Sequence, residues 1–94
     1  MIKVRVETYP AGMPRYFFHV HDGQEMPDRE GVELPGLDEA RMQAITTAGE
    51  IIRQHPDVIW NAGEWQMDVT DETGAPVFTL RFSAEDRQQR SHAA

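Results

Sequence analysis

Residues 37–54, with the sequence LDEARMQAITTAGEIIRQ, decide the fold, because they carry the clearest periodic pattern in this 94-residue chain. At 100° per residue the apolar side chains form one stripe and the polar ones lie opposite. The stripe contains Leu37, Ala40, Ala44, Ile45, Ala48, Ile51 and Ile52. Asp38 suits an N-cap, and Pro56 disfavours helical geometry at the residue before it. We therefore expect one amphipathic helix that ends near Gln54 and packs through its alanines on a sheet.

Two strand-like segments lie on each side of this helix in the sequence, and each favours an extended backbone by its composition or alternation. They span residues 15–20, 32–34, 64–71 and 76–83. Asp71 and Gly74 suit the first and fourth positions of a type I turn between the last two, and residues 55–63 are expected to form a connection. This order predicts an α+β fold, a small antiparallel sheet (ββαββ order) with one helix on one face.

The predicted core joins the inward face of the sheet to the helix stripe. It consists of Tyr16, Phe18, Val20, Leu37, Ala44, Ile45, Ala48, Ile52, Trp65, Met67, Val69, Phe78, Leu80 and Phe82. We expect a single domain over residues 13–83, because a chain of this size holds only one core. Residues 1–12 are expected to be an N-terminal extension upstream of a natural start at Met13, or an extra edge strand. Residues 84–94 are expected to be a polar C-terminal tail.

Composition excludes several classes of function. Sixteen acidic residues against nine Lys and Arg give a net charge of −7, so we expect no nucleic-acid partner. The chain has no cysteine, which removes disulfides and thiolate catalysis. No apolar run approaches the ~20 residues that span a bilayer, and we expect no membrane partner and a cytoplasmic location. Familiar enzyme signatures such as G-x-S-x-G and glycine-rich phosphate loops are absent, so we expect no cofactor and no enzymatic activity.

Three motifs together resemble a known family. They are residues 13–20 (MPRYFFHV), residues 22–23 (DG) and residues 28–35 (DREGVELP). This set is similar to short proteins, mainly from alphaproteobacteria such as rhizobia, that are catalogued as domain of unknown function 6894. The resemblance covers residues 13–83, including the alanine-rich helix and the last two strands. It implies this fold and a start at Met13, and it implies no activity.

A metal site is one hypothesis for these residues. His19 and His21 are two apart on a predicted strand, so both side chains project from the same face. Asp22, Glu25 or Asp68 could supply an oxygen ligand, and two imidazoles with a carboxylate suit zinc or iron. The alternative is that two histidines simply lie on the solvent face beside a turn.

An association surface is the other hypothesis. The sheet face opposite the helix is predicted to show Phe17, Val77, Thr79 and Arg81, and apolar patches of this kind often mark partner surfaces. Arg41 falls inside the apolar stripe of the helix, where a guanidinium needs a carboxylate. Glu33 is the candidate partner for this structural ion pair. The alternatives are a side chain that reaches solvent from the rim of the stripe and an anion-binding arginine.

Two functions follow from these patterns. The first is a small non-enzymatic protein-interaction or regulatory module, self-associating or binding a protein partner through the sheet face opposite the helix. The alternative is a metal- or small-ligand-binding domain that uses the pair His19 and His21.

Overall fold

The computed structural model describes residues 13–87. The elements are β1 (Arg15–His21), β2 (Glu25–Met26), β3 (Val32–Glu33), α2 (Leu37–Gln54), α3 (Pro56–Ala62), β4 (Glu64–Thr70) and β5 (Pro76–Ser83). The expectation of an extension or edge strand at residues 1–12 lies outside the described residues, as does most of the expected tail.

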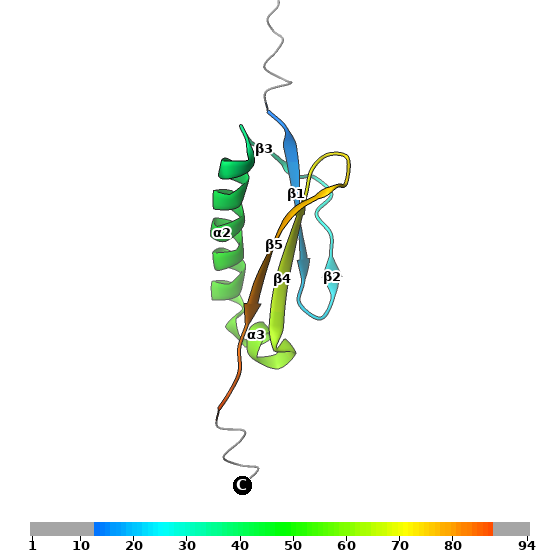
Figure 1. Ribbon diagram of the computed structural model, residues 1–94. Coiled ribbons are helices and arrows are strands. Elements are labelled where there is room, and N and C mark those ends of the chain that lie inside the picture. The colour runs from blue at the N-terminus through cyan, green and yellow to red at the C-terminus, as the bar shows by residue number, and fades with distance from the viewer. Residues whose placement is uncertain (1–12, 88–94) are drawn as a thin grey trace, which may run out of the picture.

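The strands form one antiparallel sheet in the order β2-β1-β4-β5, with β3 also paired to β1. The helix α2 runs alongside one face of this sheet (Figure 1). The fold is therefore α+β, as predicted. The helical connection returns the chain to the centre of the sheet, so that β4 lies between β1 and β5.

The hairpin of β4 and β5 forms as predicted. The Gly74 N–H donates to the Asp71 carbonyl at 3.0 Å, which closes the turn. The Asp71 carboxylate accepts hydrogen bonds from the Thr73 hydroxyl and from the Thr73 and Ala75 N–H groups. These bonds hold the pKa of Asp71 below its ordinary value of 3.8. The ladder register shifts at Thr70, which pairs with Pro76.

Helix α2 contacts the sheet through its small residues. Ala40, Ala44 and Ala48 are fully buried, and their spacing of four residues places them on one line along the helix. Ile45 is 57% exposed, so its prediction as a core residue was wrong. The contact line is narrower than the apolar stripe, because three alanines bring the helix close to the sheet along one line only. The predicted N-cap was also wrong, because Gly36 caps the helix and Asp38 lies in its first turn.

The rest of the core follows the prediction on the two central strands. The buried residues of the sheet are Tyr16, Phe18, Val20, Trp65, Met67 and Val69. Leu37 and Phe82, also predicted as core, are 37% and 38% exposed. Phe78, Leu80 and Ile52 are half-buried against the core. Packing is thus complete over β1 and β4 and incomplete over β5.

The segment between α2 and β4 is a helix rather than the expected connection. Pro56 starts α3 at its first position, where proline is well tolerated because its missing N–H has no intrahelical partner. Gly63 ends α3 with φ of 82°. Within residues 13–87, no helix is long and apolar enough to cross a membrane.

Candidate functional site

The outer side of β1, which we call the closed edge, is covered along its length. β3 pairs with Arg15 and Tyr16, and β2 pairs with Val20 and His21. Between them the Phe18 N–H donates to Oδ2 of Asp28 at 3.1 Å. A carboxylate therefore takes the place of a strand in the gap between two short strands.

The same carboxylate also shapes the loop that it comes from. Its Oδ1 accepts hydrogen bonds from the N–H groups of Glu30 at 3.0 Å and Gly31 at 3.1 Å. Partial burial raises the pKa of Asp28, but the N–H donors of Gly31, Phe18 and Glu30 together outweigh it, with a smaller contribution from His19. The pKa of Asp28 therefore lies below its ordinary value of 3.8.

Gly31 brings this loop against β1. Its φ is 71°, and a Cβ built there would lie 2.8 Å from the Tyr16 carbonyl oxygen and 2.9 Å from the Phe17 ring. No other residue type fits at that distance. Arg15 completes the closure through hydrogen bonds to the Glu30 carbonyl at 2.7 Å and the Glu33 carboxylate at 3.0 Å.

His19 belongs to this closure. Its Nδ1 accepts a hydrogen bond from the Asp28 N–H at 3.1 Å. Because a backbone N–H only donates, the proton of the neutral ring lies on Nε2 and is donated to the Thr70 hydroxyl oxygen at 3.1 Å. Both ring nitrogens are thus used within the sheet face.

His21 lies between two carboxylates. Its Nδ1 is 2.9 Å from Glu25 and its Nε2 is 2.9 Å from Asp68. Burial raises the pKa of Asp68. Hydrogen bonds from Thr79 and Gln66 and the proximity of His21 lower this pKa by a larger amount, so it lies below its ordinary value of 3.8. The two carboxylates approach opposite nitrogens of one ring and therefore cannot share an ion with it.

The metal hypothesis finds no donor set in residues 13–87. In that part of the chain, no three His, Asp or Glu side chains gather as metal ligands would. The Asp22 carboxylate accepts a hydrogen bond from the Gln24 N–H at 3.3 Å, within its own turn. His19 and His21 make separate contacts along β1, and their role as metal ligands stays a prediction.

The predicted ion pair is replaced by two others. Arg41 lies 3.2 Å from Asp38 on its own helix, and Glu33 lies 3.0 Å from Arg15. The Arg41 side chain is 59% exposed, so it reaches solvent from the rim of the stripe and needs no partner from β3. Glu33, on β3, instead pairs with the guanidinium of Arg15 on β1.

The predicted interaction face is largely hydrogen-bonded within itself. Phe17 is half-buried and stacks on His19 at 6.4 Å between ring centroids. The Thr79 hydroxyl donates to Asp68 at 2.8 Å, and Arg81 Nε donates to Gln66 at 3.1 Å. Val77 is 37% exposed. This face is therefore mainly polar, and its role in binding stays a prediction.

The outer side of β5 has a different character. The Ala84 N–H donates to the Gly63 carbonyl at 3.3 Å, and this pair continues the β4–β5 register. Hydrogen-bonded pairs alternate along an antiparallel ladder. The backbone groups of Thr79, Arg81 and Ser83 therefore point away from β4, and no strand among residues 13–87 pairs with them. We call this side of β5 the open edge.

Apolar side chains accompany the open edge on the helix side of the sheet. Phe78 and Leu80 are half-buried, and Phe82 is 38% exposed. A helix about 10 Å wide cannot cover four strands spaced about 4.8 Å apart, and α2 lies over β1 and β4. The strand at this edge therefore keeps its apolar side chains partly in solvent.

These three side chains share the helix-facing side of β5, and we call Phe78, Leu80 and Phe82 the apolar strip. The sequence placed all three in the core, and their shared position at a sheet edge depends on the strand order.

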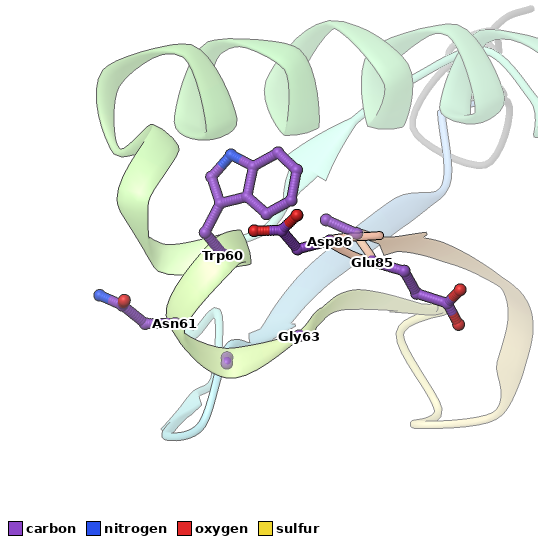
Figure 2. Close-up of a pocket in the computed structure, with 7 residues that line it drawn as sticks. Trp60, Asn61, Gly63, Glu85 and Asp86 are labelled. Atoms are coloured by element: carbon purple, nitrogen blue, oxygen red, sulfur yellow. The ribbon is translucent and has the colours of Figure 1, made fainter. Parts of the chain in front are cut away.

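Two pockets lie at the α3 end of the molecule. One, of about 610 Å³, is lined by Trp60, Asn61, Ala62, Gly63, Ala84, Glu85 and Asp86. Figure 2 shows the Trp60 indole pointing toward α2 with Asp86 beside it. The lining contains two carboxylates and no basic residue, so this pocket does not suit an anionic ligand.

The second pocket, of about 390 Å³, borders Trp65. Trp65 is 1% exposed, and its Nε1 has no hydrogen-bond acceptor among the described residues. An unpartnered buried donor costs about 1–3 kcal/mol. A water or another small hydrogen-bond acceptor at this atom would recover part of that free energy.

Comparisons with known proteins give one match. Residues 15–83 match the family model described as "Domain of unknown function (DUF6894)". No curated protein and no solved structure matches. The matched region contains both sheet edges and the whole loop of Asp28 and Gly31.

Proposed function

The chain belongs to the DUF6894 family, and since that description names no activity, we propose from the geometry of its sheet that the protein is a non-enzymatic protein-association module. The observation that carries this proposal is the open edge, the side of the eight-residue strand β5 that no strand of residues 13–87 pairs with, beside the apolar strip. An unpaired strand edge is a template for another strand, and its backbone hydrogen bonds supply the affinity.

The contrast between the two edges supports this function. The closed edge uses two short strands, an aspartate and a glycine to cover the outer side of β1. Natural sheets protect exposed edges in such ways because free edges aggregate. The open edge has no such cover among residues 13–87, which suits a surface that binds a partner.

The predicted face of Phe17, Val77, Thr79 and Arg81 becomes part of this proposal. Thr79 and Arg81 present backbone groups at the open edge, while their side chains lie on the face opposite α2. A partner strand added there would extend both faces of the sheet. We also propose a bacterial source, on the resemblance of the N-terminal motifs to alphaproteobacterial proteins. A cytoplasmic location and a regulatory role through association are part of the same proposal.

Site-specific photo-crosslinking in cells of the source organism tests this function. A photoreactive residue is placed at Ser83, on the open edge, and in a matched variant at Thr46, on the exposed side of α2. We expect protein adducts from position 83, of the protein with itself or with another protein, and none from position 46. Equal adducts from both positions, or none from position 83, would contradict the proposal.

A further inference from the structure

The occupant of the open edge follows from the sequence of β5 itself. Resting on the proposed association function, we infer that the partner is a second copy of this chain. The two β5 strands run antiparallel about a two-fold axis that passes beside Leu80. The two four-stranded paths then join into one continuous sheet, with both α2 helices on the same face.

The apolar residues of β5 are arranged symmetrically about this axis. Phe78 and Phe82 lie two residues before and two residues after Leu80. In an antiparallel pair centred on Leu80, each Phe78 therefore lies opposite the second copy's Phe82, and the two Leu80 side chains face each other. All six side chains lie on the helix side, where they complete the part of the core that α2 leaves uncovered.

The neighbouring registers fit less well. An axis at Arg81 places two guanidinium groups directly opposite each other, and like charges in that position are destabilising. An axis at Thr79 pairs Phe78 with Leu80 and leaves Phe82 opposite Pro76, without an aromatic partner. The Leu80 register places Arg81 opposite Thr79 instead. The two outward-pointing residues Thr79 and Arg81 then form hydrogen-bonded pairs across the axis, with about four bonds between the copies.

The charge of the molecule also favours this contact. The chain carries sixteen acidic residues, yet β5 contains none. The β5 strands therefore add no carboxylate of their own to a contact between two copies of net charge −7. Arg81, the charged residue of the strand, lies back across β4, with Nε 3.1 Å from Gln66 and 3.6 Å from Glu64. It leaves the backbone of the edge accessible.

The contact is small. Seven residues of strand are about 23 Å long, and the two α2 axes stand about 19 Å apart, four strand spacings. The helices therefore do not touch, and the apolar strips of the two copies fill the space between them. An interface below the standard size of about 1,600 Å² is expected to dissociate on dilution.

Cysteine cross-linking of the full chain tests the register against a background free of natural cysteines. In Leu80→Cys the two Cα atoms lie about 4.5 Å apart across a non-hydrogen-bonded pair, within disulfide range. In the matched variant Phe82→Cys they lie about 13 Å apart, beyond that range. We expect mild oxidation to convert most of the first variant to a covalent dimer and little of the second. No cross-link in Leu80→Cys, or an equal one in both, overturns the inference.

Light scattering after size exclusion provides a second test that does not depend on Leu80. The wild type is expected to approach twice the 10.7 kDa chain mass as its concentration rises. Thr79→Pro removes an N–H that faces the partner and not β4, so it is expected to remain monomeric and folded by circular dichroism. The matched variant Thr79→Val loses the hydroxyl bond to Asp68 but keeps the N–H, and it is expected to dimerise as the wild type does.

The outcomes separate this inference from the function on which it rests. A wild type that stays monomeric at high concentration overturns the inference. If position 83 then forms adducts with a different protein, the association function stands with another occupant. A monomer whose Thr79 amide is protected from hydrogen exchange would mean that the chain's own N-terminal segment covers the edge, and that result overturns both.

Discussion

The two edges of this sheet differ in whether their outward-pointing backbone groups have partners among residues 13–87. On the outer side of β1, the outward-pointing backbone groups of Tyr16, Phe18 and Val20 meet β3, Asp28 and β2 in turn. On the outer side of β5, no strand of residues 13–87 pairs with the backbone. The difference teaches that closing an edge requires specific loop residues, which the loop following β1 supplies with Asp28 and Gly31.

Replacing Gly31 with alanine should have the largest effect on the closed edge. The new Cβ would lie 2.8 Å from the Tyr16 carbonyl oxygen at a φ of 71°, so the loop must move away from β1. We expect a loss of about 3 kcal/mol in unfolding free energy and a fall in Tm of about 15 °C, measured by thermal denaturation.

Gly23→Ala is the matched control. Gly23 also has a positive φ, 101°, but a Cβ added there would meet nothing within 4 Å. This variant carries only the backbone strain, about 1–2 kcal/mol. Equal losses in the two variants would show that the loop does not press on β1 as the structure indicates.

Replacing Asp28 with asparagine should open the same edge without a steric clash. An amide group replaces one carboxylate oxygen, so either the Phe18 N–H or the Glu30 and Gly31 N–H groups lose their acceptor. We expect a loss of about 2 kcal/mol and faster hydrogen exchange at the Phe18 amide. Asp22→Asn, which disturbs one bond from the Gln24 N–H at 3.3 Å, should leave that exchange unchanged.

The sequence predicted the elements that depend on local pattern. The helix stripe, the β4–β5 hairpin and the strand at residues 15–20 each show their periodicity within a few residues, and each is present. The short strand β2 was missed because Glu25 and Met26 show no alternation. The helix α3 was missed because Pro56 was interpreted only as the end of α2. Proline also suits the first position of a helix, and here it begins α3.

The closed edge could not be predicted because it is built from contacts distant in sequence. Asp28 reads as a turn residue, and its bond to the Phe18 N–H depends on the path that the loop takes beside β1. Ile45 has the right helical phase for the core, yet its burial depends on how many strands one helix covers. Sequence periodicity gives the face of an element and not the width of the layer opposite it.

Acid should weaken the closed edge more than the open one. The pKa of Asp28 in the folded state lies below 3.8, so its carboxylate stabilises the fold at pH values above its unfolded pKa. That contribution is lost as the pH falls from about 4 through the lower folded pKa. We expect unfolding free energy to decrease over this range in the wild type, and less steeply in Asp28→Asn. Asp68 and Asp71, whose pKa values are also lowered, account for the slope that remains.

The smallest effects should come from the two arginines that flank the edges. Arg15 donates to the Glu30 carbonyl at 2.7 Å and to Glu33 at 3.0 Å, and both partners belong to the closing loop. Arg15→Gln should therefore cost about 1 kcal/mol, mainly from the bond to the carbonyl. Arg81 lies 3.6 Å from Glu64, and both side chains are more than half exposed.

Arg81→Gln should accordingly change the unfolding free energy by less than about 0.5 kcal/mol, measured at dilutions where light scattering gives the monomer mass. High salt should reduce the small effect of Arg81→Gln further, whereas the bond from Arg15 to a carbonyl oxygen is less sensitive. If Arg81→Gln proved as costly as Arg15→Gln in the monomer, the guanidinium of Arg81 would be part of the fold itself. The Arg81 side chain would then stabilise β5 through its contacts with β4 as strongly as Arg15 stabilises the closed edge, and the two edges would no longer differ in this respect.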